Sequence, residues 1–466
     1  MKITKNTQNI FYLFSLDFIV RLFGFFATAY LARTLGKEGF GLINIGLGIL
    51  SYALIISIGG LNLLGVRKVA AGEPDLSFLT SKIILLRLLL SFLVFILFAV
   101  IIYFLFDAIS FTVSLMYLIY LFPAALLIEW YFQGKQRMGN IAAGKALGMG
   151  AYLILVLILI QSPDDILFTP IAWAFGVLIN AVFLFMMAAE SDRPLLKNIL
   201  KIDSLGLLKE SLPLAGASII AQIVIMFPVI FIGITIGNAD AGIYSAAFKI
   251  IVLILVLDRV FNALFFPKIV NHLNHMPDKV EDIFKTVLKI ICFASTSIAL
   301  IVLLIGEPVI LLVFGEEYLS SVPLFQYLIG YFVLTLINSV FTYTLIGMHK
   351  EKVYTISLAL GAAMFFVFGI TITMIIGTVG MAIGLVIFEL SALTYMVLNL
   401  KEIKYSIVRT IIIPLLFTFL TAASLVELLH LSLMAELLIT FTAIILLAFT
   451  IKIGKREFNF FKQVLF

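Results

Sequence analysis

Charged side chains are scarce in this chain. They make up 12% of its 466 residues, whereas hydrophobic residues make up 63%. So few polar groups cannot cover the surface of a water-soluble protein of this length. There is also a single cysteine, Cys292, so no internal disulfide can form. The composition therefore predicts a protein that exposes its apolar surface to lipid.

Motifs for nucleotide hydrolysis, catalysis and metal binding are also absent. The sequence contains no GxxxxGK(S/T) phosphate loop and no CxxC, HExxH or GxSxG motif. Its four histidines fall in predicted loops or at the ends of apolar segments, without the spacing of metal ligands. We therefore expect no enzyme activity, no cofactor and no metal site. Uphill transport by such a chain would need an ion gradient, or coupling to the supply and removal of its substrate.

Long hydrophobic runs are what the sequence has in abundance. A helix needs roughly 20 apolar residues to cross about 30 Å of hydrocarbon. Fourteen segments of that kind predict an all-α polytopic membrane protein with about 14 transmembrane helices. The predicted spans are residues 10–32, 42–65, 83–106, 111–132, 141–160, 166–189, 210–236, 241–267, 284–305, 323–347, 353–376, 379–400, 406–427 and 431–451.

Lysine and arginine fall almost entirely on alternate loops. With the N-terminus inside, 25 of the 31 lie in or beside the inner loops. By the positive-inside rule, both termini are then cytoplasmic. The net charge of +5 reflects this topology rather than nucleic-acid binding. Two of the remaining six cations lie outside, Arg33 and Lys37. The other four lie within spans: Arg21, Arg87, Lys249 and Arg259.

A polar stretch at residues 191–209 divides the first twelve spans into two groups of six. It predicts an N-terminal lobe at 1–190, a cytoplasmic linker at 191–209 and a C-terminal lobe at 210–400. Residues 401–466 would add two further transmembrane helices and a cytoplasmic tail. Because six is even, both lobes enter the membrane in the same orientation, which predicts a parallel repeat with the main cavity between the lobes.

Two short turns at matching places in the lobes support this repeat. Gly36 and Gly41 are five residues apart between the first two spans, and Gly237 and Gly242 have the same spacing between spans seven and eight. Glycine permits the backbone angles that tight turns need. We expect both turns on the outer side.

Three cations inside spans are candidates for a binding site. An ionisable residue at the bilayer centre costs roughly 2.5 to 3.5 kcal/mol to insert and usually faces a cavity or a bundle interior. Arg21 and Arg259 come to similar depths, and Lys249 is ten residues before Arg259, roughly 80° around a helix. Together they predict a cationic cluster between the lobes, with a purely structural role for one of them as the alternative. Such a cluster favours an anion, and arginine suits phosphate in particular.

Acidic residues inside spans are candidates for gating or ion coupling. Asp17 lies four residues before Arg21 and shares its helix face, but the pair could also serve only to neutralise itself during insertion. Asp258 is expected to reach a neighbouring helix or to hold Arg259 in place. Glu389 could bind a proton or Na⁺, and a protonated carboxyl satisfied by a neighbour is an equal alternative.

Two further charged residues lie near the inner ends of their spans. Arg87 is about one turn inside the third span and is expected to extend to the inner interface. Glu129 is close to the inner end of the fourth span and is expected at the same interface.

Four segments carry a family resemblance. They are residues 30–41 with Arg33, 61–68 with Arg67, 130–138, and 306–318. Taken together and in this order, they resemble the polysaccharide transporter family, the O-antigen and oligosaccharide repeat-unit flippases. That family lies in the multidrug/oligosaccharidyl-lipid/polysaccharide flippase superfamily.

The resemblance implies two six-helix lobes in a V shape that work by alternating access. It implies a flippase that moves polyprenyl-diphosphate-linked oligosaccharide from the inner to the outer leaflet of the plasma membrane for polysaccharide biosynthesis. Partners would be this lipid-linked substrate, membrane lipids, and a polysaccharide polymerase with its chain-length machinery. Carried over by the resemblance, the diphosphate would bind Arg21, Lys249 and Arg259, with Arg33 and Arg67 as weaker positions. Asp17 would compete with the diphosphate for Arg21.

Two other functions stay open. An ion-coupled multidrug exporter of the same superfamily would be expected to have an acidic cavity, whereas the predicted cavity is cationic. A membrane-embedded polysaccharide polymerase would be expected to display a sizeable outer loop with an active site. The longest outer loop, residues 306–322, is short and carries no catalytic cluster.

Overall fold

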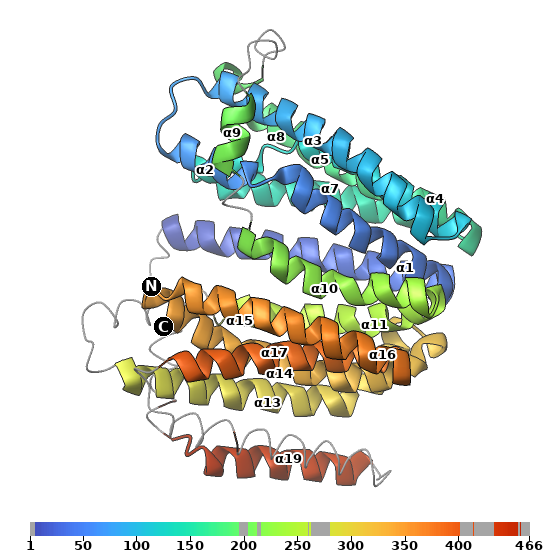
Figure 1. Ribbon diagram of the computed structural model, residues 1–466, viewed down its shortest axis with the longest axis vertical. Helices are drawn as coiled ribbons and strands as arrows, with labels where there is room; N and C mark the ends of the chain where they lie inside the picture. The colour runs from blue at the N-terminus through green and yellow to red at the C-terminus, as the bar shows by residue number, and fades with distance from the viewer. Residues whose placement is uncertain are drawn as a thin grey trace. The chain divides into compact units, whose positions relative to one another are not determined.

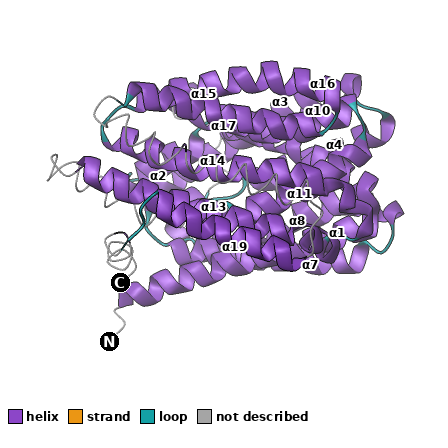
Figure 2. Ribbon diagram, turned by 90° about the horizontal axis from the view of Figure 1, so that it is seen from below, coloured by secondary structure: helices purple, strands orange, loops and turns teal. Residues whose placement is uncertain are grey.

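Helices form all the regular secondary structure of the described residues in the computed structural model of the chain (Figures 1 and 2). The structure describes residues 5–194, 204–211, 216–259, 261, 280–400, 413, 433–454 and 457. The chain divides into two compact units, Met1–Ser245 and Ala246–Phe466. The boundary between the units falls within one helix, and the predicted division into lobes at 1–190 and 210–400 stays a prediction.

The first unit is built around a long helix, α1, against which α3, α4, α7 and α10 pack. The helices α7 and α8 form a close pair beside it. The elements of this unit are α1 (Lys5–Ile58), α2 (Leu61–Ala70), α3 (Leu76–Leu105), α4 (Ala108–Leu118), α5 (Leu121–Ala125), α6 (Glu129–Gly134), α7 (Met138–Leu159), η1 (Pro163–Leu167), α8 (Phe168–Met187), η2 (Glu190–Asp192), α9 (Ser204–Ser211), α10 (Gly216–Thr235) and the start of α11 (Asn238–Ile254).

Helix α1 contains the first predicted span and residues 42–58 of the second, whose remainder lies in α2 beyond a break at Gly59 and Gly60. Gly36 interrupts α1 with φ of 66° and ψ of 178°, so the chain turns there between two helical stretches. A positive φ is open to glycine at little cost, which explains the residue at this position. The turn comes where the sequence predicted one.

The predicted span at 111–132 is wrong as a single helix. The chain forms α4, then the short α5 around Pro123, then α6 from Glu129. Irregular backbone at membrane depth needs protein donors for its carbonyl oxygens. Arg87 supplies them from α3: its Nη1 donates to the carbonyl oxygen of Leu127 at 2.7 Å and its Nη2 to that of Ala124 at 2.5 Å.

Arg87 also corrects the sequence prediction. It is buried, with 3% of its surface exposed, rather than extended to the interface. Its two bonds tie α3 to the break between α5 and α6.

In the second unit, α14 is the central helix and packs against α13 and α17, while α15 lies against α17 and α19 against α13. The remainder of α11 precedes these helices. The elements are α13 (Val280–Val313), η6 (Glu316–Ser321), α14 (Val322–Gly347), α15 (Glu351–Met364), the π-helical η7 (Phe365–Gly369), α16 (Ile370–Ile376), α17 (Val379–Asn399) and α19 (Leu433–Thr450).

The described helices confirm the predicted fold class. Ten of them are long and apolar enough to cross a membrane, and α10 and α19 contribute shorter apolar stretches. The predicted count of 14 is not confirmed, and the span at 406–427 lies outside the described residues apart from Ile413. The chain is a multi-pass membrane protein.

Candidate substrate site

A polar stripe runs along the first half of α1. Arg21, Gly24 and Thr28 share one face, and the Thr28 hydroxyl donates to the Gly24 carbonyl oxygen at 2.8 Å. Arg21 is half-buried in the first unit. The side chain of Asp17, its predicted partner, lies outside the described residues.

The second unit holds the other two predicted cations. Lys249 is half-buried on α11, and Arg259 is exposed. The helix ends at Ile254, before Arg259, so the angle of an unbroken helix does not apply to the pair. The predicted cluster of Arg21, Lys249 and Arg259 draws on both units and stays a prediction.

Both weaker motif positions are at the surface of the first unit. Arg33 is exposed near the end of the first stretch of α1, and Arg67 is exposed on α2. Next to Arg67, Lys68 forms an ion pair with Glu210 of α9 at 3.3 Å.

The two glycine-containing turns meet in the first unit. A Cβ atom on Gly41 would overlap the carbonyl oxygen of Asn238, and one on Gly242 would overlap that of Lys37. Next to this contact, Asn238 and the Ser110 hydroxyl hydrogen-bond through their side chains at 3.3 Å. Only glycine allows backbones so close together, so the starts of α11 and of the second stretch of α1 are held in direct contact.

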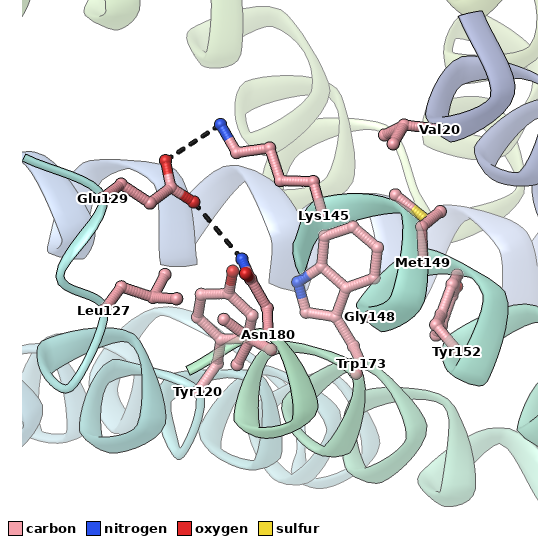
Figure 3. A pocket seen from close by; sticks show the side chains of 12 residues that line it. Val20, Tyr120, Leu127, Glu129, Lys145, Gly148, Met149, Tyr152, Trp173 and Asn180 are labelled. Atoms are coloured by element: carbon pink, nitrogen blue, oxygen red, sulfur yellow. Dashed lines mark hydrogen bonds and ion pairs between the residues drawn. The ribbon is translucent and has the colours of Figure 1, made fainter. Parts of the chain in front are cut away.

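A pocket of about 200 Å³ opens between α1, α7, α8 and the irregular segment before α6 (Figure 3). Its wall is aromatic. The rings of Tyr120 and Trp173 stack with centroids 6.0 Å apart, and Tyr152 meets Trp173 edge-on at 4.7 Å.

Glycines place these rings. A Cβ on Gly148 of α7 would press on the carbonyl oxygen of Gly176 of α8, so the two backbones pack at close range. Small residues at such contacts are typical of transmembrane helix pairs. The close pairing brings Trp173 of α8 against Tyr152 of α7.

One edge of the pocket is polar. Glu129 accepts from Lys145 at 2.9 Å and from the Asn180 amide nitrogen at 3.3 Å, as Figure 3 shows. Glu129 is a lining residue of this pocket, and its expected position at the inner interface stays a prediction. The aromatic lining was not predicted, because both tryptophans of the sequence, Trp130 and Trp173, lie within predicted spans and nothing in the sequence distinguishes Trp173 as a pocket residue.

A second polar network lies in the second unit, around Glu389 of α17. Its carboxylate accepts from the Thr335 hydroxyl of α14 at 2.8 Å and from the Asn338 amide, while Asn338 also donates to the Glu389 backbone oxygen at 2.9 Å. Glu389 is buried, with 6% exposed. None of the ion pairs between described residues includes it.

Asp258, four residues after the end of α11, joins the same network. Its Oδ1 accepts from the Ser339 hydroxyl at 2.5 Å, one helical turn after Thr335. This is the neighbouring-helix contact that the sequence suggested as one of two possibilities. The two acids, predicted separately, therefore bind adjacent hydroxyls of α14.

The described residues contain no cluster of three or more histidine, cysteine, aspartate or glutamate side chains that could hold a metal ion. The chemistry of the described sites is that of binding through charge, hydrogen bonds and aromatic surface.

Comparison with known proteins connects this arrangement to a family. A family profile described as polysaccharide biosynthesis protein matches residues 6–271, more than half of the chain. The chain belongs to this family. The polysaccharide transporter resemblance found in the sequence is thereby confirmed.

One sequence relative and two solved structures are similar to this chain. A Shigella dysenteriae protein named "Putative O-antigen transporter" is 24% identical over 414 residues, which cover 85% of this chain and 100% of that protein. The lipid II flippase MurJ in an inward closed conformation has a similar fold, with a TM-score of 0.72, 12% identity, and coverage of 94% of this chain and 97% of MurJ. An inward-facing multidrug resistance MATE family transporter of the MOP superfamily also has a similar fold. Its TM-score is 0.66 and its identity 15%, over 84% of this chain and 96% of that transporter.

Proposed function

We propose that the protein is a flippase that moves polyprenyl-diphosphate-linked oligosaccharide repeat units from the inner to the outer leaflet of the plasma membrane by alternating access. The family match, the name of the Shigella relative and the MurJ-like fold support a transporter of this type. The substrate, the direction and the membrane are part of the proposal.

The observation that carries the proposal is the set of partners that the charged side chains have inside the described spans. Glu129 is neutralised by Lys145, Glu389 is held by Thr335 and Asn338, and Asp258 accepts from Ser339. Cationic drugs need a carboxylate open to the ligand, and these three are already engaged. The half-buried cations on α1 and α11 suit an anionic group instead.

In this mechanism the diphosphate binds Arg21, Lys249 and Arg259 in a cavity between the lobes, and the polyprenyl tail stays in the lipid. Arginine is suited to this task because its planar guanidinium donates two parallel hydrogen bonds to phosphate. Arg33 and Arg67 are exposed and would act before or after this step, as further contacts for the anionic head. Asp17 would hold Arg21 while the site is empty.

The glycine turns fit the closed side of such a cycle. Contact of Gly41 with Asn238 and of Gly242 with Lys37 joins the start of α11 to α1. We assign these turns to the outer side, where they would separate when the cavity opens outward. Gly36 and Gly237, with φ of 66° and 149°, supply the bends on which the turns depend.

Glu389 and Asp258 are proposed to take up and release a coupling proton, which their hydrogen bonds accommodate without opening to a larger cation. The Thr335 hydroxyl has one hydrogen and two acceptors, Glu389 at 2.8 Å and the Tyr331 carbonyl oxygen at 2.9 Å. When Glu389 is ionised, the hydroxyl donates to it. When Glu389 is protonated, it donates to the hydroxyl, which turns to Tyr331. Ser339 stands in the same relation to Asp258 and the Thr335 carbonyl oxygen, so both acids accommodate a proton without repacking.

The test is flipping of a labelled polyprenyl-diphosphate oligosaccharide in proteoliposomes. We expect Arg21→Ala and Arg259→Ala to lower the rate at least tenfold, about 1.4 kcal/mol. Arg137→Ala, which removes an exposed arginine between α6 and α7, is the matched control and should leave the rate unchanged. Wild-type rates in both alanine variants, at equal incorporation, would refute the cationic site. A wild type that exports a cationic dye and moves no such lipid would identify a drug exporter.

A further inference from the structure

The pocket beside α1 combines a flat aromatic wall with a polar edge of no net charge. Tyr120, Trp173 and Tyr152 form the wall, and Glu129 with Lys145 forms the edge. The face of a pyranose ring is apolar and its rim carries hydroxyls that both donate and accept. Sites for such ligands have apolar and aromatic walls with a few placed polar groups.

The polar edge has capacity left for a ligand. Asn180 is buried, with 5% exposed, and its Oδ1 is enclosed against Gly144 of α7, so this residue positions the Glu129 carboxylate instead of contacting a ligand through that oxygen. Its amide nitrogen is bound to Glu129, which fixes the amide in place. The Trp173 indole N–H donates to no described residue. Lys145 is about half exposed and can give further hydrogen bonds while it holds Glu129.

Other ligand classes fit this pocket less well. A phosphate would meet the Glu129 carboxylate, and an organic cation would find that carboxylate already paired with Lys145. A hydrocarbon chain would bury the ion pair without replacing its contacts with water. A volume of about 200 Å³ is far more than one water molecule or ion requires.

The pocket also continues from the face of α1 that carries Arg21. Val20 lines it, and Gly24, one turn after Arg21 on the same face, lies against the lining residue Met149, where an added Cβ would be 3.7 Å from Cε. In a lipid-linked oligosaccharide the first sugar is bonded directly to the diphosphate. A head group held by Arg21 would therefore place its nearest sugars beside this pocket.

We propose that this pocket binds one sugar ring of the lipid-linked oligosaccharide. The nature of the ligand rests on the proposed function, but the pocket itself lies within the first unit. It acts as a subsite that selects the sugar through Trp173 and the Glu129–Lys145 pair, which Asn180 holds in place, separately from the cations that hold the diphosphate.

The test is saturation-transfer NMR on the full-length protein in nanodiscs with N-acetylglucosamine, galactose and rhamnose as probes. Wild type should give a signal with at least one of them. Trp173→Ala should weaken that binding at least tenfold, and Trp173→Phe, which keeps a ring against Tyr152, should weaken it less. Phe175→Ala, on the same helix but 47% exposed, is the matched control and should bind as wild type does.

A second variant reads the polar edge. Lys145→Ala leaves Glu129 without its cation, so the pocket should lose sugar affinity and gain binding of tetraphenylphosphonium. No sugar signal in wild type, or an undiminished one in Trp173→Ala, overturns the subsite. Displacement of sugar from wild type by tetraphenylphosphonium overturns it too, since that would mark a pocket for organic cations.

The flipping assay separates this inference from the proposed function. A protein that flips the lipid-linked substrate but binds none of the three sugars keeps its function and loses the subsite. One that binds sugar through Trp173 and flips nothing keeps the subsite and loses the function.

Discussion

At the scale of single residues, the hydrogen-bond partners of a charged side chain indicate its role better than its position along a span does. Arg87 and Arg21 both lie in apolar helices, yet Arg87 is occupied by two backbone carbonyl oxygens that the broken helix leaves at membrane depth. A charge inside a membrane protein can therefore serve the fold or the function, and its partners distinguish the two.

Removing Arg87 is expected to destabilise the protein. Arg87→Leu leaves the carbonyl oxygen of Leu127 without its side-chain donor, at a cost of about 1 to 3 kcal/mol, and removes one donor from that of Ala124, which keeps the Leu127 N–H at 3.2 Å. Thermal unfolding in detergent should show this loss, whereas Leu93→Ala, on the lipid-exposed side of the same helix, should have a much smaller effect. Equal stability of the two variants would mean that the guanidinium does not satisfy the irregular segment.

Glu389→Gln is expected to remove coupling and keep the fold. An amide can replace the protonated carboxyl in the bonds to Thr335 and Asn338, so the free energy of unfolding should stay within about 1 kcal/mol of wild type. Flipping in proteoliposomes should lose its dependence on an imposed proton gradient. Glu351→Gln, an exposed carboxylate at the start of α15, should retain it. An unchanged gradient dependence in Glu389→Gln would assign the coupling elsewhere.

At the scale of helices, hydropathy predicted well where a helix exists and poorly whether that helix is continuous. The spans at 83–106, 141–160 and 379–400 correspond closely to α3, α7 and α17. The span at 111–132 is also apolar but is broken around Pro123, and 353–376 contains a π-helical stretch at Phe365–Gly369. Mean hydropathy measures the affinity of a segment for lipid, and it does not register where a tertiary donor such as Arg87 allows the helix to open.

The contact between the two glycine turns should be lost when a methyl group is added. Gly41→Ala places a Cβ in the carbonyl oxygen of Asn238, which forces α1 and α11 apart. In a Cys292→Ser background, Ser110→Cys and Asn238→Cys should be joined by a short thiol crosslinker, and Gly41→Ala should reduce the crosslinked fraction severalfold. Ala108→Cys with Asn238→Cys tests whether the reagent is selective for that pair. Undiminished crosslinking in Gly41→Ala would show that the turns do not depend on this close approach.

The hydrogen bonds that Tyr131 and Lys135 donate to Asp192, called the polar tie below, should make the stability of the protein depend on pH. Burial tends to raise the pKa of Asp192, but hydrogen bonds from Tyr131 at 2.7 Å and Lys135 at 3.1 Å outweigh it and hold the pKa below its usual range. Burial and the same carboxylate raise the pKa of Tyr131 to about 12, so the phenol stays a donor at neutral pH.

A lowered pKa in the folded state means that the stabilisation is complete above the unfolded pKa of about 3.9 and is lost as the pH falls through the folded value. The difference in unfolding free energy between wild type and Asp192→Asn should therefore be constant near neutral pH and shrink below about pH 4. A difference that instead shrinks on raising the pH from 5 to 8 would contradict the tie.

At the scale of the whole molecule, sequence patterns carried information about the fold class and the family but little about sites. Arg21 and Glu389 stood out because a charge in an apolar run is conspicuous. Tyr120, Tyr152 and Trp173 did not, because an aromatic residue in a span is ordinary and only the packing of α7 on α8 brings their rings together. A site made of common residues is visible only once tertiary contacts are known.

The orientation of the chain in the membrane sets the direction of the proposed transport, and the two ends of α14 test it. That helix has 26 residues and, at 1.5 Å per residue, is about 39 Å long, enough to cross the hydrocarbon core. In a Cys292→Ser background, Glu317→Cys before α14 should react with a membrane-impermeant maleimide in whole cells, and Glu351→Cys after it only once the cells are permeabilised. Both carboxylates are exposed, and replacing Cys292, the one cysteine of the sequence, leaves no other thiol to react. Because the alternation of lysine and arginine is what places the N-terminus inside, the reverse labelling pattern would invert the topology. The glycine turns would then lie on the cytoplasmic side, and the cavity they close would open first to the outer leaflet.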